Sequence, residues 1–322
     1  MKIAIAGPGD VARYVIPALL SDNHSVIVLT RSSKDWITNL PSSTGTRTGT
    51  VTPVPQLITD YTSVPQLTQY LDEHGVQVLI STLAIYDASN VSIHLALLSA
   101  CTASATCHRF IPSEFGGNIR EHPDQPVLFY ENHEPIRQAL RQQSAVSFTL
   151  VCAGWFLEYL LPVGHKERML PEAGEAWAMD IDQKVMRIYG NGEQKVCLLS
   201  ARDLGAALAK LVETTEDWEE YTFLSGEQLS WNELFDKIKA RDEKWTKKPV
   251  SLAQSVRRLL EGVKKGGAEG QWESLIGTFE VLGHSEAVAL PPEDLQRQSE
   301  KFFKGLEWKG VDEVLDEGEK SA

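Results

Sequence analysis

Short apolar runs alternate with amphipathic stretches through the first half of this chain. The apolar runs predict strands, because each is short and is bounded by polar, turn-forming residues. The six expected strands lie at 1–6, 25–30, 57–60, 76–83, 109–112 and 146–151. Helical patterns occupy 10–20, 63–73, 89–101 and 131–143, and Ser63 is the expected N-cap of the second. This alternation predicts the α/β class, a doubly wound parallel sheet with helices on both faces.

The second half of the chain is less regular. It opens with an aromatic, apolar stretch at 154–161, and a strand is expected from 185, ending in the turn Gly190-Asn191-Gly192. Helices are expected at 201–213 and 231–241. The last segment, 312–322, is strongly acidic and is expected to fray.

Composition narrows the function classes. The 322 residues carry a formal net charge of −13, which disfavours binding to nucleic acid or to anionic membranes. No apolar run approaches the roughly 18 residues of a transmembrane helix, and the N-terminal run is too short for a signal peptide. The four cysteines are scattered without metal-ligand spacing, which favours free thiols in a reducing cytoplasm over disulfides or a metal.

The first strand runs directly into a glycine-rich turn, Gly7-Pro8-Gly9-Asp10-Val11-Ala12. Gly-x-Gly-x-x-Ala between a strand and a helix is typical of the Rossmann dinucleotide-binding turn. Gly7 is expected to make the tight turn, and Gly9 to let the backbone approach a pyrophosphate at the helix N-terminus. Ala12 is small enough to let the helix pack on the strand. The alternative is an ordinary strand-to-helix turn without a ligand.

The residues after the second strand indicate which nucleotide is bound. An acidic residue there holds the ribose of NAD, whereas this chain has Arg31, Ser33 and Lys34 before its first carboxylate. Arginine and lysine suit a 2′-phosphate, so NADP(H) is favoured over NAD(H), the alternative being that they are surface residues. Further cofactor contacts are expected after the third and fourth strands, at Asp60 and at Ser81, Thr82 and Leu83.

The segment from Arg109 to Gly116 reads Arg-Phe-Ile-Pro-Ser-Glu-Phe-Gly. It resembles the corresponding segment of the isoflavone reductase-like family, within the NmrA-like, atypical short-chain dehydrogenase/reductase group. Further matching segments are 151–159, 190–192, 201–204 and 229–234, and the chain looks most like fungal members that accompany secondary metabolism.

The resemblance implies an NADP(H)-binding Rossmann domain at 1–152 and a smaller α+β substrate lobe at 153–322. Segments within about 185–240 are expected to return to the Rossmann core. The nicotinamide is expected near Ser113, Glu114 and Phe115, with Phe115 either against the ring or in the core.

The resemblance also identifies a candidate catalytic residue. Reductases of this family carry a lysine acid/base four residues before an arginine, and counting back from Arg137 places His133 there. Histidine exchanges protons near neutral pH, so His133 is the candidate acid/base, although it is shorter than lysine and a poorer ribose clamp. The alternative is a polar residue of the first helical turn without a catalytic role. Pro135 favours a helix that begins later than residue 131.

The aromatic residues after the sixth strand are candidates for a substrate pocket. Trp155, Phe156 and Tyr159 are expected to line it, although a packing cluster between the lobes is a nearly equal alternative. Tyr86, just after the fourth strand, is placed where its hydroxyl could reach the substrate. The predicted function is an NADPH-dependent oxidoreductase that transfers hydride to a carbonyl or conjugated carbon of an aromatic or polyketide-like molecule. Alternatives are a non-catalytic NADP-binding regulator, or an isomerase or cyclase on the same fold. The only expected partner is the small-molecule substrate, in a monomer or homodimer.

Overall fold

The computed structural model describes residues 1–40, 53–125 and 127–320, without the side chains of 127–129. Its central element is a parallel six-stranded sheet of order β3-β2-β1-β4-β5-β6. The strands are β1 (Lys2–Ala6), β2 (Ser25–Thr30), β3 (Gln56–Ile58), β4 (Val78–Ser81), β5 (Arg109–Ile111) and β6 (Ser147–Phe148). This strand order is that of the Rossmann fold, so the predicted doubly wound sheet is confirmed.

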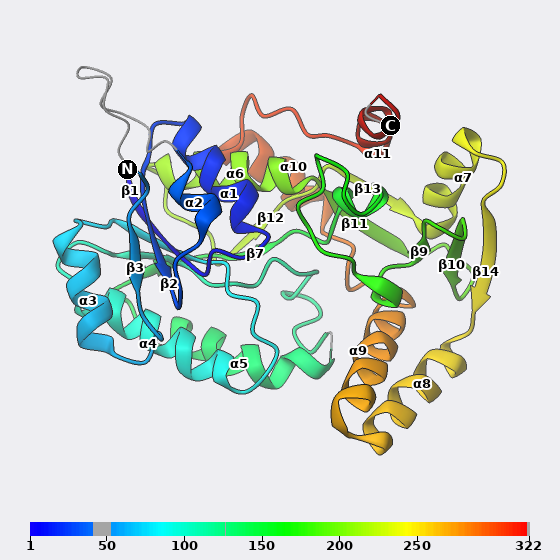
Figure 1. The fold of residues 1–322 in the computed structure, drawn as a ribbon, viewed down its shortest axis with the longest axis horizontal. Coiled ribbons are helices and arrows are strands. Elements are labelled where there is room, and N and C mark those ends of the chain that lie inside the picture. Colours follow the sequence, from blue (N-terminus) through cyan, green and yellow to red (C-terminus); the bar gives the residue numbers. More distant parts are fainter. Residues whose placement is uncertain (41–52, 126, 321–322) are drawn as a thin grey trace.

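Helices cover both faces of this sheet (Figure 1). The helices α3 (Val64–Glu73), α4 (Ser89–Ala103) and α5 (Val127–Arg141) lie side by side on one face. On the other face α1 (Ala12–Ser21) packs against α6 (Ala201–Glu213), and the short α2 (Asp35–Thr38) follows β2. Ser63 caps α3 as predicted, because its side chain accepts a hydrogen bond from the amide of Gln66.

Two predictions about element boundaries are wrong. The helix expected to begin late because of Pro135 instead begins at Val127, and Pro135 lies inside it. The buried side chains of Ile136 and Leu140 anchor α5 on the sheet, and this packing offsets the backbone hydrogen bond that a proline cannot make. The last predicted strand is divided: β6 pairs with β5, whereas β7 (Leu150–Cys152) pairs with β12 (Tyr221–Phe223).

The second lobe contains two small sheets and a helical hairpin. One sheet joins β8 (Trp155–Phe156), β11 (Lys195–Leu199) and β13 (Glu227–Ser230). The other joins β9 (Met179–Asp180), β10 (Val185–Tyr189) and β14 (Thr246–Val250). Two 3₁₀ turns, Leu157–Leu160 and Gly174–Ala176, follow β8 and precede β9. The hairpin of α8 (Leu252–Lys265) and α9 (Gly267–Gly283) projects at the lower right of Figure 1.

Parts of the second half of the chain pack against elements of the first lobe. Helix α6 packs so closely on α1 that a Cβ at Gly205 would lie 2.7 Å from the carbonyl oxygen of Tyr14. The strand β12 and the helix α10 (Pro292–Phe302) also join this lobe. By contrast β10, β11 and α7 (Trp231–Arg241), inside the expected returning range, form the hydrophobic core of the second lobe. The domain boundary at residue 152 stays a prediction.

The acidic C-terminal segment is not frayed, contrary to expectation, although residues 321–322 lie outside the described part. It forms α11 (Val311–Glu319), whose Val311 and Val314 are buried. Arg241 of α7 contacts Asp316 at 2.6 Å and Glu319 at 3.1 Å. The acidic side chains therefore pair with a basic helix face, which the local sequence does not reveal.

The composition led to predictions about membrane-spanning helices and about the cysteines. No helix within 1–40, 53–125 and 127–320 is both long and apolar enough to cross a membrane. The four cysteines, all within these ranges, are buried free thiols.

Candidate active site

The glycine-rich turn has the backbone geometry that its sequence predicts. Gly7 has a φ of 93°, and a Cβ there would lie 2.7 Å from Cδ2 of Leu83, so this position requires glycine. The hydroxyl of Thr82 donates a 2.5 Å hydrogen bond to the carbonyl of Gly7. At Gly9 a Cβ would meet its nearest atom, the carbonyl oxygen of Thr82, only at 3.9 Å. The space beside the backbone of Gly9 is therefore free for a ligand, whereas Leu83 fills the space beside Gly7.

A cavity of about 390 Å³ extends from this turn, past the ends of β4 and β5, to the second lobe. It brings together most of the predicted site residues: Gly9, Asp10, Val11, Thr82, Leu83, Tyr86, Ser113, Glu114, Phe115, His133, Trp155, Phe156 and Tyr159. Residues that the sequence did not single out complete it, among them Ile119, Gln125, Tyr130, Leu170, Phe279, Leu282 and Val288. Gly9 of the glycine-rich turn and the candidate acid/base His133 thus line the same cavity.

The structure places Ser81 away from this cavity, contrary to the expected cofactor contact. Its side chain is fully buried, and its hydroxyl lies 2.9 Å from Nε2 of His94. Nδ1 of His94 lies 2.9 Å from the carbonyl oxygen of Asn90. Burial lowers the pKa of His94 to about 4, so the neutral ring donates to Asn90 and accepts from Ser81. The hydrogen bond between Ser81 and His94 therefore links β4 to α4.

A second hollow lies at the ends of β2 and β3 and is lined by Arg31 and Asp60, two predicted cofactor residues. The guanidinium of Arg31 lies over the ring of Tyr61, 5.8 Å from its centroid. Hydrogen bonds from the amide and hydroxyl of Thr62 lower the pKa of Asp60, which therefore stays ionised. Among the described residues, Pro8, Ser33 and Lys34 border neither this hollow nor the cavity.

The loop after β5 is held in a strained conformation. Phe115 has a positive φ of 43°, which is rare for an aromatic residue and typical of functional loops. The carbonyl of the next residue, Gly116, accepts hydrogen bonds from the amides of Ala153 (2.8 Å) and Gly154 (2.9 Å). These bonds fix the loop against the end of β7.

Glu114 of this loop forms a buried ionic cluster with two residues of α5. The side chains of Glu114 and Arg137 are each 4% exposed. Arg137 donates from Nε to Oε1 (2.9 Å) and from Nη2 to Oε2 (2.8 Å), and Nδ1 of His133 lies 3.1 Å from Oε2. Burial alone would raise the pKa of Glu114, but the hydrogen bonds from Arg137 and His133 outweigh it and hold that pKa well below its usual range.

The pairing of His133 with Glu114 was not predicted. Glu134, the neighbour of His133 in the chain, instead accepts hydrogen bonds from Gln138 and Arg141. The sequence singled out Glu114 only through its place in the family segment at 109–116. That segment did not indicate which residue Glu114 would pair with.

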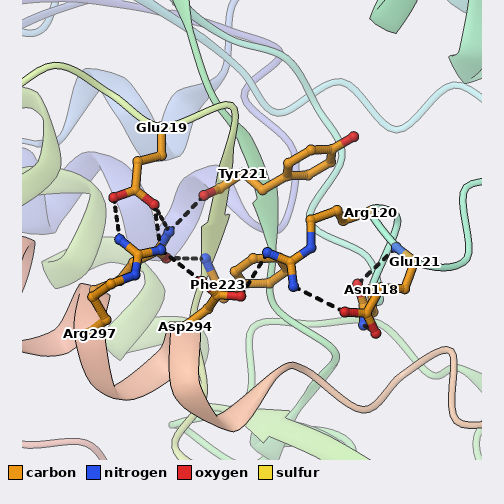
Figure 2. A network of polar contacts seen from close by, with 9 residues as sticks. Asn118, Arg120, Glu121, Glu219, Tyr221, Phe223, Asp294 and Arg297 are labelled. Carbon is orange, nitrogen blue, oxygen red and sulfur yellow. Dashed lines mark hydrogen bonds and ion pairs between the residues drawn. The ribbon is translucent and has the colours of Figure 1, made fainter.

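The far side of the same loop is tied to α10 and β12 (Figure 2). Nη1 of Arg120 lies 2.7 Å from Asp294 of α10, and its guanidinium lies over the ring of Phe223, 4.9 Å from the centroid. Asp294 and Glu219 both pair with Arg297, which extends the network (Figure 2). The cavity loop is therefore held by charged groups on both sides.

The aromatic residues after β7 both line the cavity and pack in the core of the second lobe. Trp155 and Tyr159 line the cavity together with Phe279 of α9. Trp155 also packs on Phe279 (centroids 5.3 Å apart) and on Trp177 (5.0 Å) in the core of the second lobe. They form an aromatic wall of the cavity that His133 also lines.

A Rossmann sheet, an open glycine turn and a cavity shared with a second lobe define a two-lobed protein with the dinucleotide-binding fold. The model of the NmrA-like family matches residues 1–315, so the chain belongs to the NmrA-like family, as the resemblance indicated. The oxidoreductase swnR of Arthroderma benhamiae is 34% identical over 316 residues, which cover 98% of this chain and 96% of that protein.

Two solved structures show the same fold. The leucoanthocyanidin reductase–NADPH complex from Vitis vinifera has a TM-score of 0.71 at 18% identity and covers 99% of both chains. An isoflavone reductase crystal structure has a TM-score of 0.68 at 18% identity and covers 98% of both chains.

Proposed function

We propose that this protein is an NADPH-dependent oxidoreductase that reduces a carbonyl or conjugated carbon of an aromatic or polyketide-like small molecule. The observation that carries the proposal is the single cavity that joins the open backbone at Gly9 to His133 and to the aromatic wall. The oxidoreductase name of the fungal relative and the NADPH complex of a structural neighbour support the same class.

The described residues fit NADP(H). A pyrophosphate suits the α1 N-terminus beside Gly9, where a Cβ would have no atom closer than 3.9 Å among the described residues. Arg31 at the second hollow suits a 2′-phosphate, and its guanidinium lies over the ring of Tyr61. When bound, NADPH supplies the hydride that the reduction needs.

The chain itself would contribute proton transfer and a dry pocket. His133 lines the cavity with 16% of its side chain exposed, and an imidazole exchanges protons near neutral pH. Trp155, Tyr159 and Phe279 would exclude water from the substrate and favour a flat, uncharged molecule.

The test combines cofactor binding with turnover. Purified protein is titrated with NADPH and with NADH, and absorbance at the reduced-nicotinamide band is then followed with a panel of aromatic carbonyl and quinone substrates. The His133→Asn variant should lose about 10²- to 10⁴-fold in kcat and keep its NADPH affinity. The matched control is His108→Asn, since His108 is exposed at the start of β5 and should leave both quantities unchanged.

A non-catalytic NADP-binding regulator remains the second candidate, because His133 stands where the family's reductases carry lysine. Tight NADPH binding without turnover of any substrate would favour it over the reductase.

A further inference from the structure

We propose that Glu114 is a positioning residue that holds His133 in a single tautomer, with the proton on Nδ1 and with Nε2 as the nitrogen that exchanges a proton with the substrate. This inference rests on the proposed function for its catalytic meaning. The tautomer itself follows from contacts among Glu114, His133 and Arg137 and can be measured without a substrate.

Arg137 keeps the carboxyl group of Glu114 ionised. Two hydrogen bonds from Arg137, at 2.9 and 2.8 Å, reach both oxygens of its carboxylate. The cluster is buried, and Nη1 of Arg137 donates a further hydrogen bond to the carbonyl of Pro123 at 2.8 Å, which holds the guanidinium in place. A buried arginine that forks onto a carboxylate keeps that carboxylate ionised.

The contact with Glu114 determines which nitrogen of the His133 imidazole carries the proton. An ionised carboxylate has no proton to give and only accepts hydrogen bonds. Nδ1 of His133 lies 3.1 Å from Oε2 of Glu114, so this nitrogen must carry the hydrogen. In the neutral ring the remaining nitrogen, Nε2, is then the proton acceptor.

Glu134, the other carboxylate beside His133, is paired with other side chains. Glu134 follows His133 in the chain, but its Oε1 accepts from Gln138 (3.3 Å) and Arg141 (3.4 Å). His133 and Arg137 are four residues apart on α5 and therefore lie on one face, towards the loop after β5. One carboxylate thus orients the imidazole and fixes the loop that carries Phe115.

The proton balance follows from this arrangement. The protonated ring gives its Nε2 proton to the reduced substrate and becomes neutral, while its Nδ1 proton stays in the hydrogen bond to Glu114. Water then returns a proton to Nε2. Glu114 keeps its charge throughout.

The experiment is a long-range ¹H–¹⁵N correlation spectrum of the histidine side chains, recorded on the full-length protein at alkaline pH, where imidazole rings are ordinarily neutral. The signals of His133 are identified by their loss in His133→Asn. The wild-type spectrum should show Nδ1 protonated and Nε2 unprotonated. A ring found mainly in the opposite tautomer would overturn the proposal.

The variants separate positioning from general stability. In Glu114→Gln the amide NH₂ can donate to Nδ1, so the population should shift towards the Nε2–H tautomer. Glu114→Asp keeps a carboxylate and should restore the wild-type pattern at least in part. Glu131→Gln, at an exposed position of the same helix, is the matched control and should leave the tautomer unchanged. An unchanged tautomer in a folded Glu114→Gln variant would contradict the proposal, and the wild-type spectrum decides the matter if that variant does not fold.

The turnover assay distinguishes this inference from the proposed function. Without turnover on any substrate, a wild-type Nδ1–H tautomer that depends on Glu114 would support the positioning role while the reductase proposal fails.

Discussion

Arg120 and Asp294 form a 2.7 Å ion pair that joins the loop after β5 to α10 across the first lobe (Figure 2). Arg120 also stacks on Phe223 of β12, so three segments far apart in the chain meet at one guanidinium. The cavity side of the same loop is held by Glu114 and Arg137. The loop that lines the candidate site is therefore fixed by the fold on both of its sides.

Removing this link should destabilise the protein modestly. Arg120→Met is expected to lower the free energy of unfolding by about 1 kcal/mol, because its side chain is 35% exposed and solvent weakens the pair. Urea unfolding measures the change. Lys265→Met, which removes a more exposed pair with Glu269 within the helical hairpin, is the control and should cost less than about 0.5 kcal/mol. An equal loss in both variants would show that Arg120 has no special anchoring role.

Arg31 should decide between NADPH and NADH. Arg31→Ala is expected to weaken NADPH binding by about 10- to 100-fold, the equivalent of one lost charge-assisted hydrogen bond, and to leave NADH binding nearly unchanged. Isothermal titration calorimetry with both nucleotides measures this. Lys34→Ala should have a smaller effect, since Lys34 does not border the second hollow among the described residues. Tighter binding of NADH than NADPH by the wild type would refute the assignment of the cofactor.

Gly7→Ala should show whether the close contact with Leu83 adds to the cost of the strained backbone at Gly7. The φ of 93° alone costs an alanine about 1 kcal/mol, and the 2.7 Å approach of Leu83 adds an overlap worth about 1–3 kcal/mol. Gly164→Ala is the matched control: its φ is 85°, but the added Cβ would meet no described atom within 4 Å. Thermal unfolding and NADPH titration should show the larger loss at Gly7. Equal losses would mean that the contact with Leu83 does not constrain the turn.

His94 should make the protein sensitive to mild acid. Burial lowers its pKa from 6.5 to about 4, so the unfolded chain takes up a proton between these values while the folded protein does not. The free energy of unfolding is therefore highest above pH 6.5 and falls as the pH approaches 4. We expect it to decrease by about 2 kcal/mol between pH 7 and pH 5. Urea unfolding at both pH values should show a smaller loss in His94→Gln. The same loss in both proteins would show that other groups cause it.

Local patterns in the sequence determined much of this fold. Strand β2 and the helices α6 and α7 have the predicted bounds, because apolar spacing and capping residues act over a few neighbouring positions. The glycine turn was equally predictable, since the conformation of Gly7 depends on its own lack of a Cβ. The family segment at 109–116 indicated the class of protein, which the match over residues 1–315 confirmed.

Tertiary structure alone decided the contacts of the candidate site. Ser81 was expected to face the cofactor, but the packing of α4 on β4 places His94 beside it. Pro135 was expected to mark a helix start, but buried neighbours hold α5 together around it. The partner of His133 is Glu114, nineteen residues earlier in the chain (133 minus 114), and Phe279 reaches the cavity from the far end of the sequence. A sequence pattern records the preferences of neighbouring residues, whereas such contacts depend on how distant segments bury their apolar surfaces against one another.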